Sequence, residues 1–288
     1  MGEIIDFESP VLRIEHDQAE AVATLWLDRA EARNAMGVDL WRDLPRAMAV
    51  LSADTSVRVV VIAAQGPHFS VGLDLKAMGS TLTAGGDPSG GTHSAPASMA
   101  ARARSSRTEV LRLQDAITAV ARCPKPVIAA VHGYCIGGGV DLIAACDIRL
   151  ASSDAVFSVR EAKVAIVADL GSLQRLPAII NAGHLAELAY TGKDISAERA
   201  KEIGLVNDVA ADVDGVHKAA RALAAEIAAN SPIAVQGTKA VLAANEGRTV
   251  AEGLDYVATW NAGMLASDDL VEAMTAFMEK RPPKFTGR

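Results

Sequence analysis

The chain has 288 residues, of which 50% are hydrophobic and 22% are charged, so its composition is that of a folded globular protein rather than a disordered one. Its 28 basic and 35 acidic residues give a net charge of -7. This balance argues against a general nucleic-acid or membrane surface, which needs clustered basic residues, and aromatic residues at 4% are too few for a base-stacking platform.

The chain reads as an α/β core followed by an α-helical appendage, with a soft boundary near residue 200. Apolar and β-branched runs predict strands at residues 11–14, 21–27, 57–64, 125–131, 149–151 and 155–158. Helical spacing predicts helices at residues 37–51, 107–122, 140–146, 171–180, 216–229, 233–244, 250–265 and 268–280, and the pattern after residue 183 is almost wholly helical. The stretch 79–98 is rich in Gly, Ser, Thr and Pro and predicts a mobile loop, a candidate cover for an active site.

The cysteines and the first residues of the chain give information about the cellular compartment of the protein. Cys123, Cys135 and Cys146 lie in apolar stretches without disulfide or metal-ligand spacing, so we expect reduced core residues and no metal site. The first ten residues lack a basic start followed by an apolar stretch, and no apolar run is long enough to span a membrane. We therefore expect a cytoplasmic protein that is not bound to a membrane.

Three consecutive glycines, Gly137, Gly138 and Gly139, separate a predicted strand from a predicted helix. Glycines allow close approach of a ligand to the backbone, and amides at a helix N-terminus favour negative charge. The turn can therefore hold a phosphate or an oxyanion, although a tight turn without a ligand is the alternative. The segment 68–75 also leaves a buried strand through a glycine-containing turn, where Asp74 could simply cap a following helix.

Three carboxylates lie in apolar surroundings: Asp141, Glu161 and Asp169. Burial disfavours their charged forms and raises their pKa values toward the range of general acids and bases. Each also has an ordinary structural role open to it, as a first-turn acid, an ion-pair partner or a helix cap respectively. Their spacing alone does not show that they converge.

Taken together and in this order, these segments resemble the crotonase superfamily, the enoyl-CoA hydratase/isomerase family. The matching pieces span almost the whole chain: ARNAM (32–36), HFSVGLDL (68–75), PKPVIAAVHGYCIGGGVDLIAACDIR (124–149), LGSLQRLP (170–177) and FMEKRPPKF (277–285). The resemblance implies a spiral core of β-β-α units over residues 1–200 and a helical oligomerisation region over 201–288. It also implies an acyl-CoA thioester as substrate and a homotrimer or homohexamer, while the acidic charge balance is the reason that no nucleic-acid partner is expected.

The resemblance also implies a site. By motif position, the N–H groups of Leu73 and Gly138 form an oxyanion hole for the thioester carbonyl. Coenzyme A is part of the substrate, so no separate cofactor is expected. The residues that the resemblance places against the substrate are Arg29, Arg33, Ser70, Gly72, Asp74, Gly137 and Lys280, with the three basic ones as candidate phosphate contacts.

The three acids indicate which subgroup of the family the chain resembles. Family hydratases have two glutamates, at the positions of Asp141 and Glu161, and usually a glycine at the position of Asp169. The third acid and its spacing resemble the dienoyl-CoA isomerases of fatty-acid β-oxidation, which move double bonds from positions 3,5 to 2,4. That resemblance assigns Glu161 to C2 and Asp169 to C6, while Asp141 orients the site. The alternatives are an enoyl-CoA hydratase or broad hydratase/isomerase, and a non-catalytic acyl-CoA-binding subunit.

Overall fold

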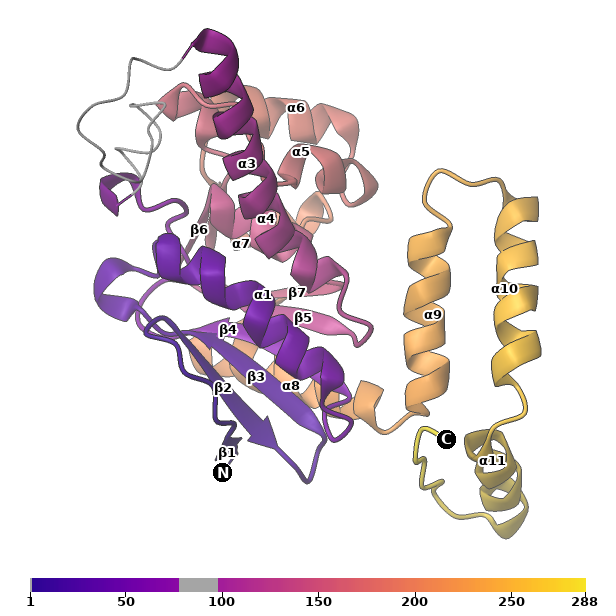
Figure 1. The fold of residues 1–288 in the computed structure, drawn as a ribbon. Helices are drawn as coiled ribbons and strands as arrows, with labels where there is room; N and C mark the ends of the chain where they lie inside the picture. Colours follow the sequence, from indigo (N-terminus) through magenta and orange to yellow (C-terminus); the bar gives the residue numbers. More distant parts are fainter. Residues whose placement is uncertain (1, 78–97) are drawn as a thin grey trace.

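The computed structural model describes residues 2–77 and 98–288 (Figure 1). Almost all of the loop predicted at 79–98 lies outside the described residues, and only Ser98 is placed, where its side chain caps the following helix by accepting a hydrogen bond from the Ala101 amide.

A seven-stranded sheet forms the centre of the molecule, in the order β1-β2-β3-β4-β5-β7-β10. The β1/β2 and β2/β3 pairs are antiparallel and all later neighbours are parallel. The bounds are β1 (Glu3–Ile4), β2 (Leu12–Asp17), β3 (Val22–Leu27), β4 (Val59–Ala64), β5 (Val127–Val131), β7 (Ile148–Ser152) and β10 (Asp208–Ala210). The six strands predicted between residues 11 and 158 are confirmed within a few residues, five of them in this sheet and the strand at 155–158 in a second sheet.

The central strand β4 shows why this sheet is buried on both faces. Side chains alternate along a strand, so Val60 and Ile62 join one hydrophobic cluster while Val59, Val61 and Ala63 join another. A parallel strand covered on both sides has no polar face, which explains its unbroken apolar sequence.

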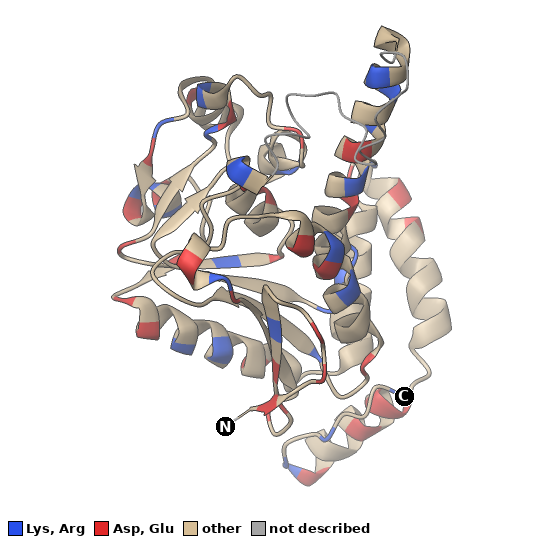
Figure 2. Cartoon of the chain, turned by 60° about the vertical axis from the view of Figure 1, so that its left-hand side comes forward, with Lys and Arg blue, Asp and Glu red and all other residues tan. Residues whose placement is uncertain are grey.

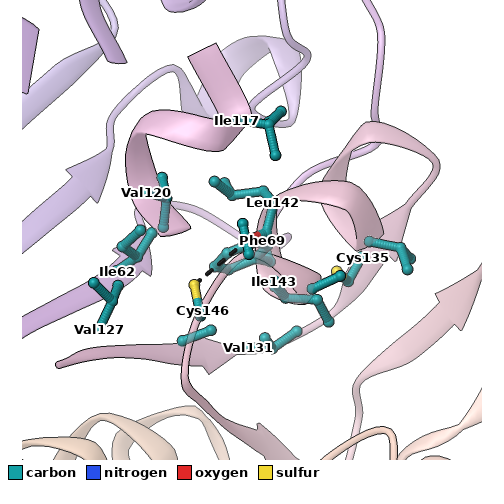
Figure 3. Close-up of a cluster of buried hydrophobic side chains, with 14 of the residues drawn as sticks. Ile62, Phe69, Ile117, Val120, Val127, Val131, Cys135, Leu142, Ile143 and Cys146 are labelled. Atoms are coloured by element: carbon teal, nitrogen blue, oxygen red, sulfur yellow. Dashed lines mark hydrogen bonds between the residues drawn. The ribbon is translucent and has the colours of Figure 1, made fainter. Parts of the chain in front are cut away.

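Helices cover the two faces (Figure 1). Helices α1 (Val38–Ala53) and α3 (Met99–Ala121) pack together over one face, and α8 (Val213–Ala228) contacts β4, β5 and β7 on the other. Between α3 and the sheet, the short helix α4 (Gly138–Ala144) inserts Leu142 and Ile143 into a cluster with Phe69 and Ile117 (Figure 3).

All three cysteines are buried and free. Desolvation raises the pKa of the Cys146 thiol to about 12, and the thiol lies 3.5 Å from the Leu142 carbonyl oxygen, to which it donates. The prediction that the cysteines are core residues is confirmed.

A second sheet of three short strands carries part of the site: β6 (Tyr134–Ile136), β8 (Val156–Ser158) and β9 (Ile195–Ser196). Together with β10, strand β9 corrects the expectation that the chain after residue 183 is almost wholly helical. These strands have two and three residues, too few for a hydrophobic period to be visible in the sequence.

Short helices connect these layers: η1 (Ala30–Ala32), η2 (Glu161–Val164), α5 (Ser172–Arg175), η3 (Leu176–Ala178), α6 (Ala182–Thr191) and α7 (Ala197–Glu202). The helix predicted at 171–180 is divided into α5 and η3. Pro177 lies at the start of η3, and because proline has no amide donor it interrupts the α-helical hydrogen bonds at this point.

The chain ends in three helices, α9 (Pro232–Ala244), α10 (Val250–Met264) and α11 (Asp268–Glu279), which extend away from the central sheet (Figure 1). They confirm the predicted C-terminal helices. The 201–288 segment also contributes β10 and α8 to the sheet layer, so the core continues beyond residue 200. The division into two regions at that residue remains a prediction.

Residues of both charge signs are interspersed along the chain in the view of Figure 2. In the described part of the chain, no helix combines the length and apolar character needed to cross a membrane.

Candidate active site

Two backbone segments that are distant in sequence meet beside α4. Ser70 pairs with Cys135 in a parallel bridge, in which the Ser70 amide donates to the Tyr134 carbonyl (2.9 Å) and the Ile136 amide donates to the Ser70 carbonyl (3.0 Å). This pairing continues the β6 ladder and brings Leu73 against the glycine turn. A Cβ built on Gly138 would lie 3.9 Å from the Leu73 nitrogen, so the two segments predicted to form an oxyanion hole are adjacent.

The amides of Leu73 and Gly138 are available to a ligand. Among the residues that the structure describes, neither N–H donates to a backbone carbonyl or a side chain, whereas the neighbouring Gly137 amide donates to the Ser158 carbonyl. Gly138 is the first residue of α4, so its N–H has no partner within the helix. Two adjacent unpaired donors at a helix N-terminus are suited to hold a developing oxyanion.

Gly72 keeps these two amides accessible. Its φ of +82° lies in the left-handed region, and a Cβ at this position would lie 2.7 Å from the Ile136 carbonyl oxygen and 3.2 Å from the Gly138 nitrogen. A side chain here would therefore push the two segments apart.

We expect Gly72→Ala to lower the rate of any reaction that uses the oxyanion hole by about 10²-fold or more, since losing one donor costs that much. Gly247→Ala is the matched control, because Gly247 has a φ of +71° but nothing within 4 Å of its built Cβ. In a thermal melt, Gly247→Ala should lose only the stability that a positive φ costs, Gly72→Ala should lose more because its Cβ meets backbone atoms, and only Gly72→Ala should lose activity while still folded. Equal activities of the two variants would show that the close approach of Gly72 to the glycine turn does not matter for the reaction.

Asp141 is the most buried of the three acids, with 1% of the residue exposed. It lies in the first turn of α4, and its Oδ1 accepts a hydrogen bond from the Ser172 amide at 2.6 Å. Burial raises the pKa of Asp141 to about 6, partly offset by the Ser172 hydrogen bonds. Asp141 therefore holds the start of α5 against the glycine turn, while the orienting role in the reaction stays a prediction.

Glu161 lies over the glycine turn. It begins η2, and its Oε1 would be 3.3 Å from a Cβ built on Gly137. Its other oxygen, Oε2, is buried and has no hydrogen-bond partner in the described structure. Burial, followed by the nearby charges of Asp141 and Asp169, raises the pKa of Glu161 to about 7. A carboxylate with an unpartnered oxygen and this pKa is suited to act as a general base near neutral pH.

Asp169 lies between η2 and α5 and is half-buried, and desolvation raises its pKa. Its backbone carbonyl accepts a hydrogen bond from Gln114 Nε2 of α3 at 2.6 Å. The charge of Asp169 raises the pKa of Asp141, and the charges of Asp141 and Asp169 both raise the pKa of Glu161, so the three acids lie near enough to interact electrostatically. The sequence left this proximity open, and the catalytic roles of the three acids stay predictions.

The predicted basic residues lie in two places, with Arg29 and Arg33 at the two ends of η1 and Lys280 at the end of α11. Arg29 pairs with Asp74, with 2.9 Å between Nη1 and Oδ2, whereas Arg33 is exposed in a left-handed conformation with φ of +53°. Lys280 ends α11, which lies apart from the α4 region in this chain (Figure 1). In the described part of the chain, no hydrogen bond or ion pair joins Lys280 to the other predicted site residues.

Ser70 supports the site rather than lining it. The residue is fully buried, its hydroxyl donates to the Asn34 carbonyl at 2.8 Å, and its oxygen accepts from the Gly72 amide at 3.1 Å. Sequence reasoning missed the supporting residues Asn34 and Gln114. Asn34 lies in the ARNAM motif, but the motif did not assign it a role. No local pattern could identify Gln114, because its hydrogen-bond partner is 55 residues away in the sequence.

Known proteins resemble this chain over nearly its full length. The family model described as enoyl-CoA hydratase/isomerase matches residues 17–288. The peroxisomal Δ3,5-Δ2,4-dienoyl-CoA isomerase of Arabidopsis thaliana is 44% identical, covering 94% of this chain and 95% of the relative. The mitochondrial Δ3,5-Δ2,4-dienoyl-CoA isomerase of Homo sapiens is 42% identical, covering 99% of this chain and 84% of the relative.

These relatives correct one expectation. They are named as peroxisomal and mitochondrial proteins, which contradicts the predicted cytoplasmic location. The prediction depended on the reduced core cysteines and on the lack of a recognised secretion signal or membrane span, and these properties do not distinguish the cytosol from those compartments. Targeting signals are read by receptors, so the location of a protein does not follow from its fold.

The fold agrees with the sequence comparison. The crystal structure of enoyl-CoA hydratase from Bacillus anthracis superposes with a TM-score of 0.84 at 31% identity, covering 96% of this chain and 100% of that chain. The predicted crotonase-like architecture is confirmed. With the matched family model, the full-length relatives and this fold, the chain belongs to the enoyl-CoA hydratase/isomerase family.

Proposed function

We propose that this protein is a Δ3,5-Δ2,4-dienoyl-CoA isomerase. The observation that carries the proposal is the third acid, Asp169, clustered with Glu161 beside two unpaired amides. The relatives named as dienoyl-CoA isomerases support it.

The reaction is a proton transfer in which the double bonds move and no atoms are gained or lost. Ionised Glu161 removes a proton from C2 of the 3,5-dienoyl thioester, and the electron pair passes to the carbonyl oxygen to form a dienolate. The Leu73 and Gly138 amides stabilise that oxyanion, each donor contributing roughly 3–4 kcal/mol to the transition state. Because no electrons are exchanged, the step requires no cofactor, and coenzyme A enters as part of the substrate.

Protonated Asp169 then delivers a proton to C6, the carbonyl reforms, and the double bonds are left at positions 2 and 4. A single carboxylate cannot comfortably serve both C2 and C6, which explains the value of a second acid. Burial keeps a proton on an acid of this cluster near neutral pH, as delivery to carbon requires.

The second candidate is a 2-enoyl-CoA hydratase. The observation that favours it is the presence of two acids, Asp141 and Glu161, that could together position a water molecule. Asp169 has no catalytic role in that reaction. The test is a paired spectrophotometric assay with a 3,5-dienoyl-CoA and a 2-enoyl-CoA. Growth of the conjugated dienoyl chromophore much faster than loss of the enoyl chromophore supports the isomerase. Hydration alone would replace it with the hydratase, and binding without either reaction would leave the non-catalytic subunit.

The pH dependence should reflect one proton held jointly by Glu161 and Asp169. The active form needs Glu161 ionised and Asp169 protonated, so the pair must carry a single proton. Because interacting acids titrate as a pair, kcat/KM should be bell-shaped, falling as pH rises above about 7 and the shared proton is lost. It should also fall at lower pH, where the second proton binds. A rate that only rises through pH 7 would show that Asp169 does not need its proton.

We also propose that the protein acts as a homotrimer or homohexamer. Helices α10 and α11 expose large apolar side chains in the isolated chain, including Leu254 (62% exposed), Val271 (66%) and Phe277 (83%). Exposed apolar area on this scale marks an interface between proteins. Light scattering after size-exclusion chromatography would test this, and a monomer at micromolar concentration would contradict it.

A further inference from the structure

We infer that Arg29 and Asp74 form a positioning pair that holds the Leu73 amide in the oxyanion hole. The inference rests on the proposed function, because it concerns how the same site is kept in register. Neither side chain is placed on the reacting atoms.

The backbone around Leu73 is held on both sides by one residue. The Met36 amide donates to the Gly72 carbonyl at 2.8 Å, and the Asp74 amide donates to the Met36 carbonyl at 3.0 Å. These two bonds make the parallel bridge between Met36 and Leu73. They orient the Leu73 peptide and leave its own N–H without a partner in the described structure.

Asp74 secures the chain directly after that amide. Its Oδ1 accepts hydrogen bonds from the Lys76 and Ala77 amides at 3.2 and 3.0 Å, and its Oδ2 accepts from Arg29 Nη1 at 2.9 Å. The Ala77 amide and then the Arg29 guanidinium lower the pKa of Asp74, so it is an anion at neutral pH. With its side chain 12% exposed, Asp74 is well shielded from solvent, where an ion pair is screened least.

Arg29 is itself held by a rigid turn. Its amide donates to Asn34 Oδ1 at 2.9 Å, and the Asn34 amide donates back to the Arg29 carbonyl at 3.0 Å. Asn34 Nδ2 in turn donates to the carbonyls of Gln65 and His68, each at 2.9 Å. The ion pair therefore joins two loops, residues 29–36 and 72–77, across the position of the Leu73 amide.

The energetic consequence follows from the geometry required of an oxyanion donor. Such a donor acts at 2.7–3.1 Å from the position of the oxyanion, and complete loss of one lowers kcat by roughly 10²–10³-fold. Breaking the ion pair leaves the donor present but less well placed. We therefore expect kcat to fall by about 10–100-fold, a partial loss within that limit, with little change in KM.

The test compares Asp74→Asn and Arg29→Met with the wild type and with Asp28→Asn. Asp28 is the matched control because it is the residue next to Arg29 and its carboxylate also pairs with an arginine, Arg13, at 3.1 Å. In the described structure its side chain has no hydrogen bond or ion pair to the 72–77 segment. Each protein is assayed with a 3,5-dienoyl-CoA and with the corresponding pantetheine thioester, which lacks the nucleotide. Arg29→Lys, which keeps the charge but not the fork, should be intermediate, and circular dichroism verifies folding.

A second measurement does not depend on turnover. A 2,4-dienoyl thioester bound in the oxyanion hole should absorb at longer wavelength than the free ligand, because the two amides polarise its carbonyl. The inference expects a smaller red shift in Asp74→Asn and Arg29→Met, together with a loss of kcat that persists with the pantetheine thioester. The control should match the wild type in both.

Two results would overturn the inference. Unchanged kcat and an unchanged red shift would show that the pair does not position the amide. An increase in KM for the Arg29 variants that disappears with the pantetheine thioester would show that Arg29 binds phosphate instead. If the wild type polarises the ligand but isomerises nothing, the proposed function fails, while the red shifts of the variants still decide the role of Arg29 and Asp74.

Discussion

Replacing Glu161 by Gln should lower kcat for dienoyl-CoA isomerisation by roughly 10²–10⁴-fold, the range expected for loss of a general base. The amide has nearly the same shape as the carboxyl group but cannot accept the C2 proton. The carboxyl that it replaces has a buried oxygen without a hydrogen-bond partner and a pKa raised to about 7. Conversion of a 3,5-dienoyl-CoA to its conjugated isomer, followed by absorbance, measures the loss.

Substrate binding should survive this change, because the Leu73 and Gly138 amides are untouched. Glu202→Gln is a suitable control, since Glu202 is exposed on α7 and its ion pair within the described residues is with Arg199 on the same helix. The variant should also lose exchange of the C2 proton in deuterated water. Undiminished isomerisation in Glu161→Gln would remove Glu161 from the role of base.

Replacing Asp169 by Asn has a different expected result, because it separates the two proton transfers. Isomerisation should fall by roughly 10²–10⁴-fold, since the acid that serves C6 is lost. Glu161 can still remove and return the C2 proton, so the substrate should exchange deuterium at C2 without moving its double bonds. Mass spectrometry of the recovered 3,5-dienoyl-CoA detects that exchange.

The pH dependence of this partial reaction should have the opposite sign to that of the full reaction. Exchange needs only ionised Glu161, so its rate should rise with pH and level off near the pKa of Glu161, which is about 7 in the wild type. In the variant this pKa should be somewhat lower, because the charge of Asp169 no longer raises it. Asp169→Gly gives a second comparison, since it places at this position the residue usual in family hydratases. If either variant isomerises as fast as the wild type, the third acid has no part in the reaction and the hydratase becomes the better proposal.

The fold followed from the sequence where local patterns were long and strong. Strand β4 was predicted from an unbroken apolar run, and α10 and α11 were predicted from helical periodicity. The predictions failed for β9 and β10, whose two and three residues form strands only because neighbouring strands supply their hydrogen bonds. The helix predicted at 171–180 was divided because Pro177 removes a donor within it.

The sequence by itself determined the identities of the candidate groups: a glycine turn, a second glycine-containing segment, three acids in apolar surroundings, and their order along the chain. These properties are local, because they depend on residue type and on near neighbours. Whether the acids converge depends on contacts between residues far apart in the chain, such as the bond between Asp141 and the Ser172 amide 31 residues later. The tertiary structure alone decided that convergence, the pairing of Leu73 with the glycine turn, and the engagement of Arg29 with Asp74 across 45 residues. Burial in a common site then raises the pKa values of the acids, and no local pattern specifies burial by a distant segment.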